Sequence, residues 1–364
     1  MDRGLTRSSV AVIVTSNAEG AAMTQDAVRI RDVVVERGTT CRGFLKVGET
    51  GAGPVEMPVV VIHGARPGPT LCLTGGVHAT EYPGQTAVRE LTRELDPSTL
   101  TGTVIAIPVV NLPMFAARSG FISPIDGLNL NRVAPGRPDG TITELIAHTL
   151  FTEILTQATH HIDCHGGDLG EALWPYAAYR MTGDAELDRT GEAMARCWSP
   201  RIVALFRDGT PMIPSGTVTT EAAKRGIASI LGECGSDNGL DPADVRTHLH
   251  GITNVMRYLG MLPGHPLVPA RQLLGTGQFV VHARRGGLVR LSTDVGQTVA
   301  EGQTLGEIWD VFGDVVETLR APAQGLVRLV WTRKVVNSGD PVLKCWVTEP
   351  APPFAPTDRF LGPA

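Results

Sequence analysis

A histidine and a glutamate three residues apart, His78 and Glu81, are the first side chains in this sequence that could hold a metal ion. They follow an apolar segment that predicts a strand, residues 70–76, and precede residues 88–95, whose apolar spacing predicts a helix. Open α/β sheets bind ligands at the carboxyl edge of their strands, where both side chains can turn toward one point. Imidazole nitrogen and carboxylate oxygen suit zinc, and three protein ligands leave a fourth position for water. The alternative for this pair alone is a helix start, in which His78 caps the helix and Glu81 favours its first turn.

A third candidate ligand, His165, follows another short apolar segment at residues 161–164. This strand would bring His165 to the same sheet edge, and Asp163 is placed to orient a ligand, as metal-bound histidine usually requires. His160 and His161 lie further back along the segment and fit the site less well. We expect structural or surface roles for four other histidines, His148, His248, His250 and His282.

A carboxylate at a further strand end, Glu233, could act as a general base. It follows the apolar residues 227–231 and lies between Gly232 and Gly235, which let backbone crowd a small pocket. Beside a metal-bound water it could accept a proton and pass it to a leaving amine. Without the metal triad, a solvated loop glutamate would be the better interpretation.

Two segments offer groups that could bind substrate. Asn131 and Arg132 present an amide and a guanidinium side by side, and arginine can bind a carboxylate through two parallel hydrogen bonds. Arg118 offers a second cation. The alternative for either arginine is a salt bridge at the surface.

The elements that must position these residues alternate between strands and helices. Residues 103–110 form an almost continuous apolar run, which is typical of a strand buried on both faces. Residues 141–158 predict a helix that starts with a capping box, and residues 242–258 predict a last helix. This alternation predicts an α/β domain with helices on both faces of the sheet.

The composition changes near residues 262–266, and short strands separated by Gly and Asp turns follow. Residues 1–25 are rich in small and polar types, so we expect a loose N-terminal extension there, with Met23 as an alternative start. A catalytic α/β domain should occupy residues 26–262, and its early strands could be shared with a β-rich C-terminal domain at residues 263–364.

Composition narrows the classes of function. A net charge of −5, with 42% hydrophobic and 19% charged residues, fits a globular protein and gives no reason to expect nucleic acid. No apolar stretch is long enough to span a bilayer, so no membrane partner is expected. The six cysteines include no CxxC pair, which favours reduced thiols and a cytoplasmic location.

Taken in order, the motifs resemble a known family. HxxE at residues 78–81, DGxNLNRxxPG at 126–136, DxHGG at 163–167 and GECG at 232–235 are similar to the succinylglutamate desuccinylase/aspartoacylase family of the zinc carboxypeptidase clan. The resemblance covers about residues 40–345 and implies a mixed, zinc carboxypeptidase-like sheet. It implies one zinc per chain, held by His78, Glu81 and His165. It also implies Glu233 as the general base, and Asn131 and Arg132 as substrate contacts.

Three features depart from the family pattern. Ala79 and Thr80 stand between the first two ligands, where the family has Gly and often Asp. Ala134 replaces a phenylalanine of the xFPG turn, and the C-terminal region contains no tyrosine that could reach the substrate. Ala79 and Thr80 would alter the loop without touching the ligands, and the missing tyrosine bears on the substrate more than on the mechanism.

The C-terminal region has a resemblance of its own. Residues 295–303 and 319–327 look like the two halves of a biotinyl or lipoyl barrel-sandwich domain. Such a domain carries its cofactor on a lysine, but residues 310–333 contain none. We therefore expect a small all-β, barrel-sandwich-like domain that serves as a cap or in assembly.

The expected function is zinc-dependent hydrolysis of the amide bond in a small N-acylated amino acid or amine, which releases a carboxylate and a free amine. The expected partner is this small N-acyl substrate, and a homo-oligomer is left open. A metallocarboxypeptidase that cleaves a peptide C-terminus is one alternative. A non-catalytic metal-binding or scaffold protein is another, although it would not need Glu233.

Overall fold

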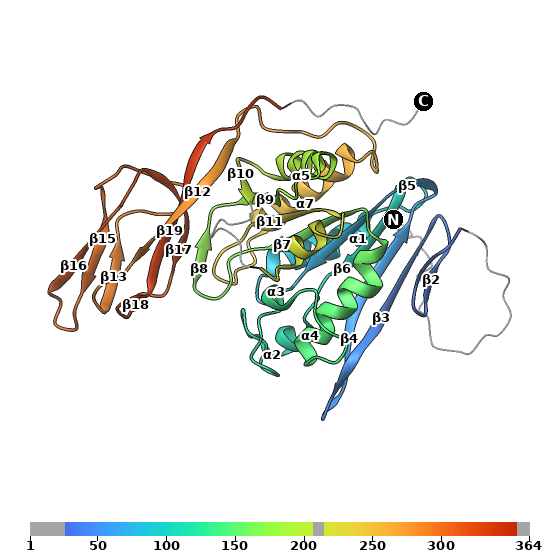
Figure 1. Ribbon diagram of the computed structural model, residues 1–364, viewed down its shortest axis with the longest axis horizontal. Helices are drawn as coiled ribbons and strands as arrows, with labels where there is room; N and C mark the ends of the chain where they lie inside the picture. Colours follow the sequence, from blue (N-terminus) through green and yellow to red (C-terminus); the bar gives the residue numbers. More distant parts are fainter. Residues whose placement is uncertain (1–25, 207–214, 355–364) are drawn as a thin grey trace, which may run out of the picture.

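The structure, a computed structural model, describes residues 26–206 and 215–354. Most of the chain in these ranges builds around one large sheet with helices on both faces (Figure 1). The predicted N-terminal extension and the alternative start at Met23 lie outside the described residues.

The large sheet is mixed, as the family resemblance implied. In spatial order its strands are β14 (Thr298–Val299), β17 (Gly325–Trp331), β19 (Pro341–Pro350), β12 (Leu273–His282), β10 (Ile202–Phe206), β9 (Tyr176–Arg180), β11 (Ala228–Glu233), β7 (His160–His165), β5 (Arg66–Gly75), β6 (Thr101–Ile107), β4 (Gly53–His63) and β3 (Thr39–Thr50), with β8 (Glu171–Leu173) paired to β17. β6, β5, β7 and β11 lie side by side and parallel, whereas β9 pairs antiparallel with β11, and β3 and β4 form an antiparallel hairpin at one edge.

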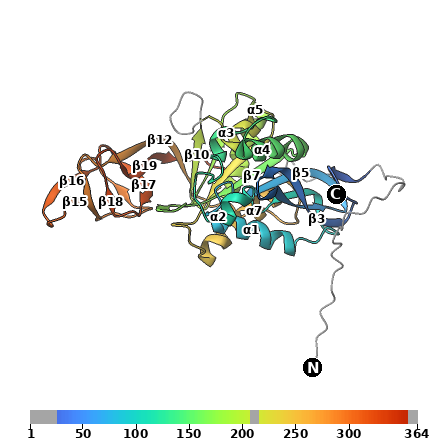
Figure 2. The same ribbon diagram turned by 90° about the horizontal axis from the view of Figure 1, so that it is seen from below.

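Helices cover both faces of this sheet, which confirms the predicted fold class (Figures 1 and 2). On one face, α1 (Tyr82–Glu94), α5 (Ala185–Trp198) and α7 (Pro242–Tyr258) contribute to one apolar core. On the other face, α4 (Ile142–Thr149) and α6 (Val218–Ala223) pack into a second core. The remaining short elements are α2 (Leu112–Ala117), α3 (Leu130–Val133) and the hairpin of β1 (Val28–Ile30) and β2 (Val33–Val35). None of the described helices has both the length and the apolar character needed to cross a membrane.

The helix predicted over residues 141–158 is less regular than its sequence pattern. The backbone N–H of Thr141 donates to the Glu144 carboxylate over 2.9 Å, the half of a capping box that holds the helix start. After α4 the chain forms a π turn at Leu150–Ile154 and a 3₁₀ turn at Leu155–Gln157. Apolar side chains still face the core through both turns. The spacing of apolar residues in the sequence therefore resembles that of one continuous helix.

The C-terminal strands extend the large sheet instead of forming a detached body. β12 pairs in parallel with β10, and β19, β17 and β14 continue from it. A second sheet of β16 (Val315–Arg320), β15 (Thr304–Trp309), β13 (Gly287–Leu291) and β18 (Val335–Val336) packs on these strands around its own core. The expected all-β region is therefore present, and the boundary near residue 262 stays a proposal.

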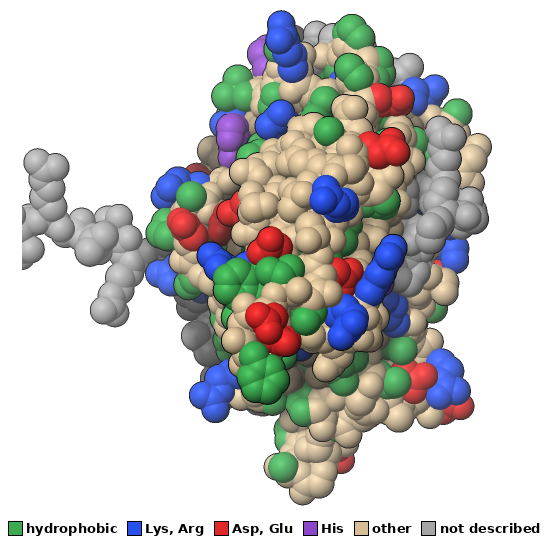
Figure 3. Space-filling view, turned by 90° about the vertical axis from the view of Figure 1, so that its left-hand side faces the viewer, with side chains coloured by type: hydrophobic (Ala, Val, Ile, Leu, Met, Phe, Trp, Pro, Cys, Tyr) green, Lys and Arg blue, Asp and Glu red, His purple; other side chains and the backbone are tan. Residues whose placement is uncertain are grey.

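The end of the molecule formed by this region faces the viewer in Figure 3, where apolar side chains lie among charged ones. The exposed apolar residues of the region include Val311 and Phe312, which are 92% and 87% exposed. The homo-oligomer considered from the sequence stays a prediction.

We expect neither biotin nor lipoate on this region, because no lysine stands in the turn that would carry it. Intact-mass measurement of protein purified from cells that make both cofactors should give the mass of the unmodified chain. An adduct of either cofactor would contradict this expectation.

Candidate active site

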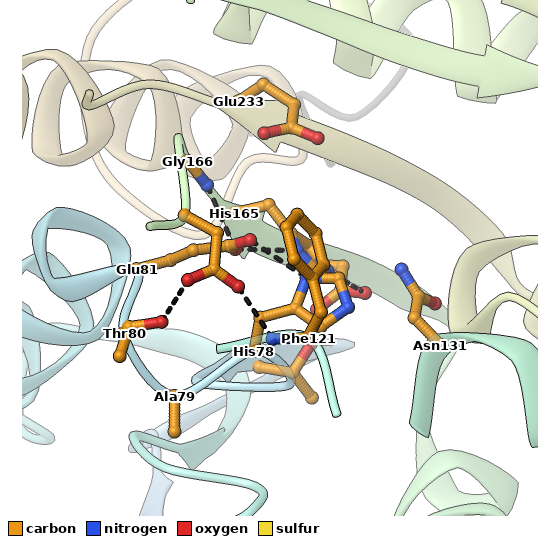
Figure 4. Close-up of polar contacts among 12 residues, drawn as sticks. His78, Ala79, Thr80, Glu81, Phe121, Asn131, His165, Gly166 and Glu233 are labelled. Atoms are coloured by element: carbon orange, nitrogen blue, oxygen red, sulfur yellow. Dashed lines mark hydrogen bonds and ion pairs between the residues drawn. The ribbon is translucent and has the colours of Figure 1, made fainter. Parts of the chain in front are cut away.

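Three predicted metal ligands meet at one edge of the large sheet. β5 and β7 are parallel neighbours, with Gly75 opposite Cys164, so the chain leaves both strands at the same edge. His78 and Glu81 lie in the loop after β5, and Glu81 is the N-cap of α1. His165 is the last residue of β7. The strand ends therefore bring together residues that are more than eighty positions apart in sequence (Figure 4).

The three side chains form a compact, buried donor set. Nδ1 of His78 lies 2.8 Å from one oxygen of Glu81, and Nδ1 of His165 lies 2.8 Å from the other. One ligand atom from each residue lies within 4.8 Å of the others, and the residues are 5%, 3% and 2% exposed for His78, Glu81 and His165. Two imidazole nitrogens and one carboxylate oxygen fit a zinc ion with an open fourth position.

The contacts behind these ligands also fit a metal site. Nε2 of His165 donates to Asp163 over 3.0 Å, and Nε2 of His78 donates to the Asn129 side-chain oxygen over 3.1 Å. Both rings are thereby held with Nδ1 toward the cluster, as metal-bound histidine requires. The N–H of Gly166 donates to Glu81 over 3.1 Å. Asp163 makes the orienting contact expected from the sequence.

The cluster is strongly coupled electrostatically. Burial alone would raise the pKa of the Glu81 carboxyl, but His165 and His78 together lower it to about 2. Burial would likewise lower the pKa of His165, but Asp163 and Glu81 raise it well above its usual value. The metal-free cluster therefore holds a proton that a metal ion must displace.

This proton makes a testable prediction about zinc binding. Adding zinc to the metal-free protein near neutral pH should release about one proton per site, because the metal binds neutral histidine. Zinc affinity should rise with pH until His165 loses its proton. Calorimetric titration in buffers with different heats of ionisation would count the protons. A zinc affinity that stays constant as the pH is raised would contradict the coupling.

Glu233 lies beside the cluster at the end of β11. It is in register with His165 on β7 and with Tyr176 on β9. Its Oε1 accepts a long hydrogen bond of 3.5 Å from the Tyr176 hydroxyl, which in turn accepts one of 2.8 Å from Arg328. Its Oε2 is buried and has no partner among the described residues. Burial raises the pKa of Glu233 to about 8, against the effect of His165.

The predicted substrate contacts separate into two groups. Asn131 and Arg132 line the same pocket as the metal cluster and Glu233. The Asn131 side-chain oxygen accepts from Val218 N–H over 2.8 Å, and its nitrogen turns toward the histidines in Figure 4. Arg118 is exposed at the end of α2 and does not line this pocket. The structure therefore gives no support to the predicted contact between Arg118 and substrate.

The unusual Thr80 between the ligands has a clear structural role. Its hydroxyl donates to Asp168, which also accepts from the backbone N–H of Phe121 over 2.7 Å. The Phe121 ring packs edge-on against His78, with ring centroids 5.0 Å apart. A Cβ on Gly120 would meet Asp168 at 2.2 Å, so this approach requires glycine. Thr80 thus fixes the loop that packs on one ligand, and the ligands themselves are unaffected.

Most of the residues that line the pocket are ones that sequence reasoning did not single out. The cavity has a volume of about 250 Å³ and is also lined by Glu171, Tyr176, Gln278, Arg328 and Lys344. The last three come from the C-terminal strands β12, β17 and β19. Arg328 and Lys344 each stand alone within an otherwise apolar stretch, residues 326–331 and 342–347. A lone charge of this kind does not indicate which site it faces, so these two residues were not identified from the sequence.

Comparisons with known proteins show which family the chain resembles. A family model described as the succinylglutamate desuccinylase/aspartoacylase catalytic domain matches residues 67–259. The N-alpha-acetyl-L-2,4-diaminobutyric acid deacetylase of Halomonas elongata is 30% identical over 312 residues, which cover 82% of this chain and 89% of that protein.

Solved structures show the same relationship. The product-bound ectoine utilization protein EutE of Ruegeria pomeroyi is 28% identical, with a TM-score of 0.79, and the match covers 90% of this chain and 97% of that one. A succinylglutamate desuccinylase/aspartoacylase of Rhodobacter sphaeroides is 29% identical, with a TM-score of 0.75 and coverages of 84% and 95%. The resemblance drawn from the sequence and the expected class of deacylase are confirmed. This chain belongs to the succinylglutamate desuccinylase/aspartoacylase family.

Proposed function

We propose that this protein is a zinc-dependent deacylase that hydrolyses the amide bond of a small N-acylated amino acid or amine. The observation that carries the proposal is the placement of Glu233 in the same buried pocket as His78, Glu81 and His165. A site that only bound metal would not need a buried carboxylate with a free oxygen beside the ligands. The products would be a carboxylate and a free amine.

Zinc held by the three ligands would polarise the amide carbonyl and make water a better nucleophile at neutral pH. Glu233 accepts the proton that the attacking water loses and returns it to the nitrogen of the departing amine. Its pKa of about 8 reflects burial, which outweighs the lowering effects of His165 and Arg328, and a further positive charge in the cluster would favour the carboxylate form. The proton thus passes from water to Glu233 to the leaving group, and Glu233 ends in its starting state.

Neighbouring residues orient this base and the substrate. The Tyr176 hydroxyl, which accepts from Arg328, can direct its own proton to Glu233 and hold one carboxylate oxygen in place. The other oxygen then remains free for the proton transfers. Arg132 lines the pocket without an acidic partner among the described residues, so it is available for a substrate carboxylate. Asn131 would add an amide N–H, because its oxygen is engaged by Val218.

The size of the pocket and the side chains that the C-terminal strands add to it favour a small substrate over a peptide. Strands β12, β17 and β19 contribute Gln278, Arg328 and Lys344 to its lining. A cavity of about 250 Å³ suits an N-acyl amino acid, whereas a metallocarboxypeptidase needs a groove for several residues. We therefore prefer the deacylase to the carboxypeptidase.

A substrate screen tests the proposal. Zinc-loaded protein is incubated with N-acyl amino acids that differ in acyl group and side chain, and with peptides that end in the same residues. The Halomonas relative deacetylates N-alpha-acetyl-L-2,4-diaminobutyric acid, so that compound belongs in the set. We expect amine release from at least one N-acyl amino acid and little from peptides. Preferential cleavage of peptides would favour the carboxypeptidase, and no cleavage by the zinc-loaded protein would favour a binding protein.

A further inference from the structure

The mechanism proposed above leaves two charged residues of the pocket, Glu171 and Lys344, without a role. Glu171 lies in β8, which pairs with β17 through Glu171 and Trp331. Its N–H donates to Asp168 O over 3.0 Å, and its carbonyl accepts from Asp237 N–H over 2.6 Å. A Cβ on Gly167 would meet the Glu171 carbonyl oxygen at 2.3 Å, so glycine is needed there. The backbone of Glu171 is therefore fixed at the pocket wall.

The Glu171 carboxylate has no close partner within the described part of the chain. It lines the pocket, but it makes no hydrogen bond or ion pair with another described residue. Burial raises its pKa to about 7, and the nearby Glu81 adds to this effect. This half-buried carboxylate has no hydrogen-bonded or ion-paired cation among the described residues, and a bound ligand could supply one.

The cations around Glu171 have other contacts. Arg328 donates to Tyr176 and stacks over the Trp346 ring at 4.4 Å from its centroid. Arg132 donates to the Asn131 carbonyl over 2.6 Å. Of the cations, Lys344 has the largest electrostatic effect on Glu171, but its amine lies over the Trp331 ring, 5.2 Å from the ring centroid. The pocket therefore has positive groups for a substrate carboxylate and a separate negative group.

We propose that Glu171 determines specificity by binding a free ammonium group on the substrate, so that the preferred substrates are N-acylated diamino acids. The proposal rests on the deacylase function inferred above. The substrate would carry a carboxylate for Arg132 or Lys344, an acylated nitrogen at the metal cluster and a second, unacylated nitrogen at Glu171. An ammonium there would form a charge-assisted hydrogen bond in a largely desolvated site.

A structural explanation competes with this proposal. Glu171 could serve only to balance Lys344, whose pKa is lowered first by burial and then by Arg328. In that case the loss of either charge would disturb the pocket for every substrate. A measurement that compares substrates with and without an ammonium separates the two roles.

The experiment uses the zinc-loaded full chain and two substrates of the same length, Nα-acetyl-2,4-diaminobutyrate and Nα-acetylnorvaline. The side chain of the first ends in an ammonium group, and that of the second ends in a methyl group. For Glu171→Gln we expect the ratio of kcat/KM values, cationic to neutral, to fall roughly 10- to 100-fold, the range for losing a hydrogen bond to a charged group. The change should lie mainly in KM, because the ammonium is distant from the bond being broken.

Two further variants complete the test. Lys344→Met should keep or increase the preference for the cationic substrate, since it removes a positive charge that competes for Glu171. Glu301→Gln changes an exposed glutamate that is not part of the pocket and should leave the ratio unchanged. Three results would each overturn the proposal. The first is an equal loss of kcat/KM on both substrates in Glu171→Gln, and the second is a fall in the ratio for Lys344→Met as large as that for Glu171→Gln. The third is a wild-type preference for the neutral substrate.

Binding measurements test the ammonium site at Glu171 independently of the proposed deacylase reaction. Calorimetry with free 2,4-diaminobutyrate and norvaline requires no turnover. If the zinc-loaded protein hydrolysed no N-acyl amino acid, the proposed function would fail. Tighter binding of diaminobutyrate that depends on Glu171 would then still support the ammonium site, and equal binding of both compounds would overturn it.

Discussion

Glu233→Gln should lower turnover by roughly a hundredfold or more while the protein keeps its zinc. Glutamine has the same size and can keep the contact with Tyr176, but it cannot accept the proton of the attacking water. The three metal ligands are untouched, so zinc content should stay at about one per chain. Substrate binding should weaken much less than turnover, because Glu233 acts mainly in the transition state.

Steady-state kinetics and elemental analysis of the same preparation would check this prediction, with Glu301→Gln as the matched control. The fold should survive, since the change introduces no charge and no new volume. Near-full turnover with zinc bound would show that another group is the base. Loss of zinc together with activity would show that Glu233 is a ligand and that the triad is assigned wrongly.

Replacing His165 or His78 with alanine should reduce zinc from about one per chain to almost none, and activity with it. Among the described residues, these two histidines and Glu81 are the only group of three whose ligand atoms lie close enough to share an ion. Removing one leaves two ligands, too few to retain zinc against a chelator. Thermal stability should also become insensitive to added zinc, because a metal stabilises only the state that binds it.

His165→Ala also deprives two buried carboxylates, Glu81 and Asp163, of their partner, which could destabilise the fold. His78→Ala therefore provides the second test, and His250→Ala, an exposed position on α7, is the control. Elemental analysis after dialysis gives the result directly. Full zinc occupancy in both site variants would refute the assignment of the ligands.

The metal cluster could be predicted because its parts have local signals. His78 and Glu81 lie in the loop after β5 and His165 ends β7, and the carboxyl ends of these parallel neighbours meet by topology. Helix α7 was predicted with its observed bounds, since Asp241 and Pro242 form a strong start signal. Helix α1 begins at Tyr82, six residues before the predicted segment, and Pro83 in its first turn was the overlooked sign.

The segment between His165 and α6 was the main omission. No element was predicted for β9, α5 or β10, although Asp184 caps α5 by accepting from the N–H groups of Glu186 and Leu187. β9 reads Tyr-Ala-Ala-Tyr-Arg, in which the two tyrosines favour a strand but the two alanines do not, so its strand signal is mixed. Tyr176, which contacts the candidate base, was missed for this reason.

The contribution of the C-terminal strands could not be predicted from local pattern. Arg328 and Lys344 reach the pocket because β12 joins the large sheet beside β10, a pairing between residues about seventy positions apart. Strand pairing of this kind depends on tertiary packing. The six cysteines are all free and buried, which agrees with the expected reduced thiols, and the cytoplasmic location stays a prediction.

The central claim, a zinc-dependent deacylase, is tested most directly by stripping and restoring the metal. The protein is dialysed against a chelator and titrated with zinc while amine release from its best N-acyl amino acid is followed. We predict no activity in the metal-free protein and a linear return that ends at about one zinc per chain. Full activity in protein shown to contain no metal would contradict the account.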